Sequence, residues 1–424
     1  MKTLERIKTS SRPESKPSKR VNLIRPLIQP FFVLLVSILL LEGIFTVARI
    51  GERDYLEPDP VTGVALIPNK RITYRGENYS SRLINKYGMA WREPSLKKAS
   101  GLFRIAVLGD SMIEGAQVEE CQTMCHFLEQ NLNANGSGQK FEVLNFGVPS
   151  FTLGQAYLLL KEKALSFQPD LVLIFVRDHA SYGVTPPHLE SGFPLGARPY
   201  FFVAANGALY KSNAYLMQWW RGQEAKRLRN LGWLRRHSHI WGALGAIVEQ
   251  SMNWFMQTRA NFDQFLSKAC LNFSPKMIAD KAPAPKAPSA NPPASSDPSA
   301  LPGEQRTTQC VRQYFPVVAA ILREMNRSCD QKESKFAMIY IGSKDEAGLA
   351  EYDLMKSFAS DKSIQLLDLT ESFDKAQSHS TAPLFLSDAH FTPSGHEVFA
   401  KLIANDLRQW KWFQDRPKTL TDPR

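Results

Sequence analysis

The stretch FRIAVLGDSMIEG, residues Phe103–Gly115, decides the fold of this chain. Its apolar run Ile105–Leu108 has the length and composition of a buried strand. The strand is expected to end at Gly109-Asp110-Ser111, after which apolar residues recur at helical spacing. A serine at the start of a helix lies beside free backbone N–H groups and a partial positive charge, which stabilise a developing anion. An ordinary turn with a capping serine is the alternative interpretation.

A second stretch, Leu386–His396, supplies the residue types that a hydroxyl nucleophile requires. A serine needs a general base, and the base needs a carboxylate that orients it. Asp388 and His390 are close enough in sequence for one loop to hold both near Ser111. His396 leads into the apolar pattern of a last helix, so we expect it to pack there.

With both stretches, the chain resembles the SGNH (GDSL-type) hydrolases, and in particular their bacterial membrane-anchored members. The resemblance covers roughly residues 54–180 and 336–407 and leaves out the middle of the chain. The matching segments are Asn85–Arg92, Gly109-Asp110-Ser111, Val143–Ser150, Leu173–Asp178, and Asp388-x-His390 with the Pro393 and Gly395 that follow it.

The resemblance implies ester chemistry with assigned roles. Ser111 would attack the carbonyl carbon, His390 would act as general base and Asp388 would orient the imidazole. The oxyanion donors would be the Ser111 N–H, the Gly147 N–H and a side chain of the third block. That block departs from the family, which usually has Asn where this chain has Arg177. Arg177 would stabilise the oxyanion, bind an anionic substrate, or pair with a carboxylate and point away.

Three functions are consistent with these residues. The first is a serine esterase that hydrolyses O-acyl esters, including O-acetyl groups on surface glycans. The second is an O-acyltransferase, because the Asp-x-His spacing resembles that of proteins that O-acetylate exported polysaccharides. The third is a catalytically inactive scaffold, because the usual Asn is missing. The sequence identifies neither the acyl group, the acceptor, a protein partner nor the oligomeric state.

Candidate strands alternate with helical patterns outside the middle of the chain. The alternation predicts a parallel sheet with helices on both faces, and the resemblance implies a three-layer, flavodoxin-like α/β/α fold. Sites in such sheets lie at the carboxyl ends of strands, where Ser111, Gly147 and Arg177 are expected. The candidate strands are roughly Arg104–Leu108, Glu142–Asn145, Leu171–Val176, Phe336–Ile341 and Ile364–Leu367, and the helical patterns are roughly Glu120–Ala134, Leu153–Leu165 and Arg312–Met325.

The net charge of +11 is concentrated at the N-terminal end. Residues 1–25 hold eight Lys or Arg and two Glu, and account for +6 of it. No nucleic-acid-binding motif accompanies this charge, so no nucleic acid is expected as a partner.

The 23 residues between Arg25 and Arg49 contain no Lys or Arg, enough for a spanning helix of about 20 residues. An uncleaved anchor over 26–48 is favoured over a cleaved signal peptide, because no small-x-small cleavage site follows. The basic side predicts cytoplasmic residues 1–25 and a catalytic domain on the periplasmic side of the inner membrane. Glu42 would lie at the membrane interface or pair with a partner helix.

The remaining chain divides by composition. Residues 54–100 are expected to be an irregular segment in which Asn85 and Arg92 fix a loop, and 101–412 a hydrolase-like domain. The domain is interrupted by a helical insert over 211–272, after a hairpin at Tyr200–Tyr210, and by a Pro/Ala/Ser-rich disordered loop over 273–306. The Trp- and Arg-rich insert is either a helix on the membrane surface or, as favoured, a subdomain with a solvated basic face.

Neither metal nor cofactor is expected, because the His and Cys residues lack metal-ligand spacing. Five cysteines are few for a disulfide framework. Cys121 and Cys125 would share one face of a helix, where a bond is awkward. Cys270 and Cys310 flank the Pro-rich segment and would close it off, unless all five are reduced packing residues.

Overall fold

The apolar segments of the alternating pattern form one five-stranded sheet. The computed structural model describes residues 21–52, 55–75, 77–134, 138–177, 197–245, 303–342, 346–362 and 364–410, with the single residues 184, 247 and 413. The strand order is β11-β10-β7-β5-β6, and every pairing is parallel. The five predicted strands are confirmed as β5 (Leu102–Gly109), β6 (Lys140–Gly147), β7 (Leu171–Arg177), β10 (Lys335–Ile341) and β11 (Gln365–Asp368).

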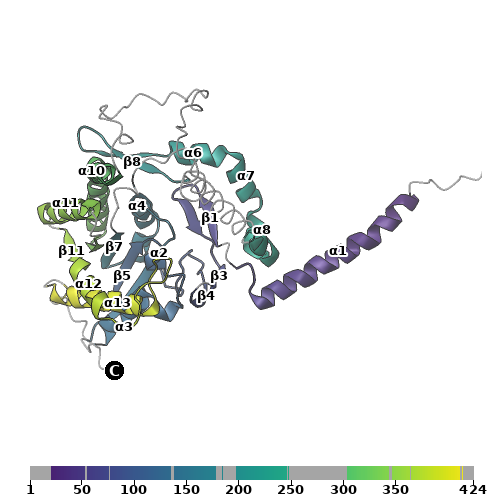
Figure 1. Cartoon of the computed structure of the whole chain (residues 1–424), viewed down its shortest axis with the longest axis horizontal. Helices are drawn as coiled ribbons and strands as arrows, with labels where there is room; N and C mark the ends of the chain where they lie inside the picture. Colours follow the sequence, from purple (N-terminus) through teal and green to yellow (C-terminus); the bar gives the residue numbers. More distant parts are fainter. Residues whose placement is uncertain are drawn as a thin grey trace, which may run out of the picture.

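Helices cover both faces of this sheet, so the three-layer α/β/α fold is confirmed (Figure 1). One face is covered by α4 (Leu153–Glu162), α10 (Gly303–Asp330) and α11 (Glu346–Lys362). The other face is covered by α3 (Met124–Asn133), α12 (Thr370–His379) and α13 (Pro393–Gln409). The first two predicted helices are shorter than expected, because each adjoins a 3-10 turn: η1 (Glu120–Gln122) before α3 and η2 (Ala164–Phe167) after α4.

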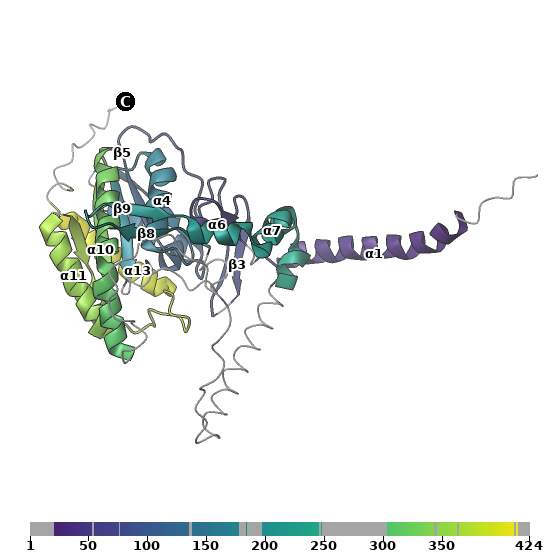
Figure 2. The ribbon, with the colours of Figure 1, turned by 90° about the horizontal axis from the view of Figure 1, so that it is seen from above.

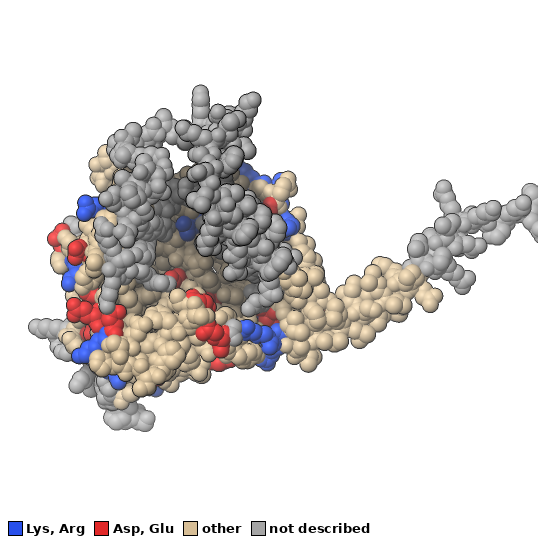
Figure 3. All heavy atoms as spheres, viewed as in Figure 1, with Lys and Arg blue, Asp and Glu red and all other residues tan. Residues whose placement is uncertain are grey.

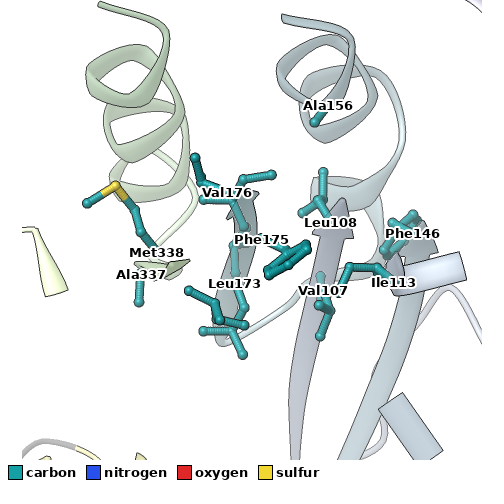
Figure 4. Packing of buried hydrophobic residues seen from close by; sticks show 14 of the residues in the cluster. Val107, Leu108, Ile113, Phe146, Ala156, Leu173, Phe175, Val176, Ala337 and Met338 are labelled. Atoms are coloured by element: carbon teal, nitrogen blue, oxygen red, sulfur yellow. The ribbon is translucent and has the colours of Figure 1, made fainter. Parts of the chain in front are cut away.

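The strand order creates a switch point at β5. The chain leaves β5 toward β6 on one side, and the later strands β7, β10 and β11 lie on the other. At such a point the loops after neighbouring strands diverge and leave a crevice at the carboxyl ends. The strands of the sheet are mainly apolar, with Ile105–Leu108 fully buried. Figure 4 shows side chains from four strands packed with Ile113 and Ala156 from the helical layers.

The prediction of an irregular segment over 54–100 is wrong, because this part forms two antiparallel hairpins. The second hairpin buries polar residues, Thr73, Ser80 and Arg82, so its strands lack the apolar alternation that predicts a strand. The expected loop is confirmed: Asn85 Oδ1 accepts from Tyr87 N and its Nδ2 donates to Arg92 O. The hairpins are β1 (Leu56–Asp59) with β2 (Gly63–Leu66) and β3 (Arg71–Arg75) with β4 (Tyr79–Leu83).

The predicted hairpin before the insert is confirmed as β8 (Tyr200–Val203) and β9 (Leu209–Ser212), and its Gly207 adopts a φ of 78°. Three short helices follow: α6 (Ala214–Arg221), α7 (Gln223–Asn230) and α8 (Gly232–His237). Helical structure continues over 239–245. Trp254, Cys270 and the Pro-rich segment lie outside the described residues.

An isolated helix, α1 (Val21–Ala48), extends away from the α/β body (Figure 2). Within the described residues, it is the one helix long and apolar enough to cross a membrane, over Ile28–Ala48. The expectation that Cys121 and Cys125 share a helix face is wrong. Cys121 is exposed in η1 and Cys125 is buried in α3, because the chain turns at Thr123 between the two elements.

Candidate active site

Ser111 lies at the switch point, as the first residue of the short helix α2 (Ser111–Glu114) that follows β5. The Asp110 side chain caps this helix by accepting a hydrogen bond of 2.9 Å from Met112 N. Gly115 ends the helix at a φ of 64°, in the left-handed region that glycine adopts without strain. The sequence Gly-Asp-Ser-x-x-x-Gly therefore encodes a sharp strand-to-helix turn that presents the Ser111 hydroxyl.

His390 reaches this hydroxyl from a part of the chain 279 residues away. Its Nε2 lies 2.8 Å from Ser111 Oγ, a hydrogen bond in which the imidazole accepts the serine proton if Nε2 is unprotonated. On the other side of the ring, His390 Nδ1 lies 3.1 Å from Asp388 Oδ1. That contact is close, but Nδ1 has no aligned hydrogen-bond partner among the described residues. The same oxygen also accepts the His390 backbone N–H at 3.1 Å.

The loop that holds Asp388 and His390 is a tight turn. Leu386 N donates to His390 O at 2.7 Å and Ala389 N donates to Leu386 O at 3.0 Å. Ala389 has a φ of 63°, a left-handed conformation that costs a non-glycine residue roughly 1–2 kcal/mol. The turn brings the side chains on either side of Ala389 together, and strain of this kind is common at functional sites.

Hairpin β3–β4 supports the same loop from outside the sheet. Tyr74 OH donates to Asp388 Oδ2 at 3.2 Å, and Ser387 N donates to Glu77 Oε1 at 2.8 Å. Partial burial raises the pKa of Asp388, but the hydrogen bonds and charge of His390 and the Tyr74 hydroxyl outweigh it and hold the pKa below its usual value. Asp388 is therefore ionised at neutral pH.

The Gly147 N–H is not placed as the expected oxyanion donor. Gly147 ends β6 beside Gly109, but its N–H donates to Asn145 Oδ1 at 2.9 Å. Asn145 Nδ2 donates to Ile113 O at 2.7 Å, so this buried amide clamps the turn of α2 onto β6. Glycine is required at 147 because a Cβ there would lie 2.1 Å from Glu114 N.

Arg177 ends β7 and pairs with Ile341 in the neighbouring strand. Its backbone therefore lies at the same edge of the sheet as Ser111, as expected. The Arg177 side chain and Asp178 lie outside the described atoms, so the three interpretations of Arg177 stay open.

A second group of ionisable residues is buried beneath α2. Glu114 is completely buried, and the buried Arg82 Nη2 donates to Glu114 O at 2.6 Å. Burial raises the pKa of Glu114 to about 7 against the opposing charge of Arg82. His396 accepts a hydrogen bond from Met124 N, and burial lowers its pKa to about 3. The expectation that His396 packs rather than reacts is confirmed by this burial.

The structure adds four residues that the sequence did not indicate: Tyr74, Glu77, Arg82 and Glu114. Their partners are distant in sequence or lie in the backbone, so spacing carries no sign of them. Asn145 was not predicted either, although a polar residue inside an apolar strand is a signal that the sequence offers for it. A cavity of about 550 Å³ lies elsewhere, between α4, α10 and hairpin β8–β9, and is lined by none of the residues around Ser111.

Several solved structures are similar to this chain. A G-D-S-L family lipolytic protein from Desulfitobacterium hafniense is 12% identical, covers 71% of this chain and 98% of its own, and has a TM-score of 0.33. A variant of an acetylxylan esterase from Geobacillus stearothermophilus is 10% identical, with 73% and 95% covered and a TM-score of 0.35. A lipase/acylhydrolase from Enterococcus faecalis is 11% identical, with 72% and 95% covered and a TM-score of 0.33. No protein-family model matches the sequence, and no curated protein is similar to it.

Proposed function

We propose that this chain is a membrane-anchored ester hydrolase of the SGNH (GDSL) type, with Ser111 as nucleophile, His390 as general base and Asp388 as the orienting carboxylate. The observation that carries the proposal is the Ser111–His390–Asp388 constellation. Its two contacts, of 2.8 and 3.1 Å, join residues at the switch point of a parallel sheet. The inactive-scaffold alternative does not explain why Ala389 is held in a strained conformation between two of these residues.

The reaction follows from the contacts. Ser111 Oγ attacks the ester carbonyl carbon while His390 Nε2 takes the serine proton. The tetrahedral intermediate collapses, the C–O bond to the alcohol breaks, and His390 returns the proton to the leaving oxygen. Water then attacks the acyl-enzyme with the same base, releasing the carboxylic acid and restoring Ser111. Asp388, ionised at neutral pH, stabilises the imidazolium in both steps.

The oxyanion requires donors in place of the Gly147 N–H. The Ser111 N–H is the first of α2 and lies at the nucleophile itself. The turn 148–151, which includes Ser150 at a φ of 60°, is a second candidate source of oxyanion donors. It lies beside the nucleophile turn, because Val148 N donates a hydrogen bond to Gly109 O. Arg177 is the third candidate, from the neighbouring strand end.

The proposed substrate is an O-acyl ester, including an O-acetyl group on a surface glycan, processed outside the cytoplasmic membrane. The apolar helix α1 supports the anchor, and the basic residues 1–25 support a cytoplasmic N-terminus. Transfer of the acyl group to a polysaccharide hydroxyl would use the same acyl-enzyme, with the acceptor in place of water. The Asp-x-His spacing favours this second candidate.

The test uses the full chain in detergent micelles. Wild type is expected to release p-nitrophenol from p-nitrophenyl acetate and to be labelled by a fluorophosphonate, and Ser111→Ala to lose both. Ser387→Ala, a serine beside Asp388, is the matched control and should be labelled like wild type. A folded wild-type protein that is neither labelled nor active would refute an activated nucleophile. Faster p-nitrophenol release on addition of a glycan acceptor, with acyl groups found on it, would identify a transferase.

A further inference from the structure

The end of α1 is attached to the insert by a partly buried acidic cap. Glu42 is the one charged residue between Arg25 and Arg49. Its carboxylate accepts hydrogen bonds from Ser238 Oγ at 2.9 Å, from Ile240 N at 3.2 Å and from His239 N. These donors begin the helical segment 239–245, so a residue of the apolar helix caps a helix of the insert.

The backbones are also in direct contact at this junction. A Cβ on Gly242 would lie 1.8 Å from Gly51 O, and a Cβ on Gly51 would lie 2.0 Å from His239 O. Thr46 Oγ1 lies 3.2 Å from His239 Nδ1. Figure 1 shows α8 beside the end of α1. The segment is therefore fixed on the last turns of α1 rather than joined to it by a loose linker.

The position of Glu42 along α1 sets the depth of this contact. It precedes Ala48 by six residues, which is about 9 Å along a helix. The 23 residues between Arg25 and Arg49 extend for roughly 34 Å, slightly more than a bilayer core of about 30 Å. If α1 spans the membrane, the residues bonded to Glu42 lie within about 9 Å of the outer end of the span, which matches the depth of about 5–10 Å that an interfacial helix reaches.

The segment held at this level exposes large apolar side chains. Trp233 is 69% exposed, Leu244 is 51% exposed and Ile247 is 59% exposed. Single exposed apolar residues are ordinary on a soluble surface, but these lie within 15 residues of one another on the segment attached to the span. Arg236, which pairs with Glu57 at 2.6 Å, is exposed beside them, and Lys and Arg side chains gather where α1 meets the body (Figure 3). Tryptophan with nearby cations is the usual composition of a membrane interface.

We propose that residues 232–245, together with Ile247, form a second membrane contact, which lies in the outer interface of the bilayer and fixes the orientation of the catalytic domain. Trp233, Leu244 and Ile247 enter the boundary between headgroups and acyl chains, and Arg236 stays among the phosphates. The inference rests on the membrane anchor of the proposed function. This inference replaces the interpretation of the insert as a subdomain with a solvated basic face, because the contacts of Glu42 place this part of the insert at the level of the membrane.

The test measures the lipid contact of Trp233 in the full chain, incorporated into phosphatidylcholine/phosphatidylglycerol nanodiscs. The Trp233 emission is the difference between wild type and Trp233→Phe. Lipids brominated in the middle of their acyl chains should reduce this emission at least twofold, and aqueous iodide should reduce it little. The matched control is Trp219→Phe, which isolates a tryptophan of α6 whose Nε1 donates to Glu224 at 3.1 Å. Its emission should be insensitive to the brominated lipid.

Quenching of the Trp233 emission by iodide but not by brominated lipid would overturn the proposal, as would equal lipid quenching of the Trp233 and Trp219 emissions. Failure of the anchor has a different signature, which is release of the full chain from membranes by alkaline carbonate. Failure of the catalytic proposal has a third, which is absence of fluorophosphonate labelling in detergent. The three results differ, so failure of the second membrane contact can be told apart from failure of the anchor and from failure of the catalytic proposal.

Discussion

Replacing Glu114 by Gln tests the electrostatics beneath the nucleophile. The Glu114 carboxyl is completely buried three residues after Ser111, and neither of its oxygens has a hydrogen-bond partner among the described residues. Arg82 donates to the Glu114 backbone oxygen instead. Burial raises the pKa of the carboxyl to about 7, and the nearby Asp110 charge adds to the rise, while the Arg82 charge opposes it. Glu114 is therefore largely protonated in the folded protein below neutral pH.

The size of the expected change in stability follows from the linkage between proton binding by Glu114 and folding. A rise in pKa from 4.5 to about 7 corresponds to roughly 3 kcal/mol of folding free energy. The folded state binds this proton more tightly than the unfolded state, so the stabilisation is complete below pH 4.5. It is lost as the pH rises toward 7, where the buried group ionises. Gln cannot ionise, so Glu114→Gln removes this loss and should have a flatter stability profile.

The assay is urea unfolding of the full chain in detergent, followed by near-ultraviolet circular dichroism at pH 5 and pH 8. The free energy of unfolding of Glu114→Gln relative to wild type should rise by roughly 2–3 kcal/mol between these two pH values. Glu162→Gln, an exposed carboxylate on α4, is the control and should follow wild type at both. A Glu114→Gln curve parallel to wild type would refute the reasoning, because it would mean that Glu114 is already ionised at pH 5.

Other contacts predict separate outcomes. Asn145→Ala leaves two buried backbone groups unpaired, so it should lower the free energy of unfolding by about 2–4 kcal/mol in urea titrations and slow fluorophosphonate labelling. Tyr74→Phe removes one hydrogen bond to Asp388 and should lower esterase kcat severalfold with Tm nearly unchanged. If Arg177 stabilises the oxyanion, Arg177→Ala should lower kcat about 100-fold, whereas unchanged turnover would remove it from the oxyanion site. Ala389→Gly should keep activity, because glycine adopts a φ of 63° without strain, and Ala389→Val should abolish it, because a β-branched residue is strained there more than alanine is.

The sheet was predictable because its strands are short apolar runs that must be buried on both faces. Ile105–Leu108 and Leu171–Val176 carry that signal in their composition alone. Hairpin β3–β4 does not carry this signal, because most of its buried residues are polar and contact partners elsewhere in the fold. Ser80, for example, donates to the backbone oxygen of Ala116, a contact that no local pattern encodes.

The candidate site was predictable in part for a related reason. Two local motifs contain Ser111, Asp388 and His390, and the residue types in these motifs indicate their chemistry. The fold brings the three residues together. The Gly147 expectation was wrong because a hydrogen-bond donor is available only if nothing nearby accepts from it. The side chain two residues earlier, Asn145, takes that N–H. Such competition depends on side-chain geometry, which the strand pattern does not specify.

Hairpin β3–β4 connects the two ends of the proposed mechanism. On one side, Arg75 donates to Ala48 O at 3.0 Å, in the last turn of α1. On the other, Tyr74 and Glu77 hold the loop of Asp388. One hairpin therefore contacts both the proposed membrane anchor and the proposed catalytic carboxylate, so the site has a defined position relative to the bilayer if α1 spans it. Hydrolysis of an ester that diffuses freely would not depend on a fixed position of the site relative to the membrane. An ester carried at the membrane surface would reach Ser111 in a constant orientation, which is the advantage that proximity confers on catalysis.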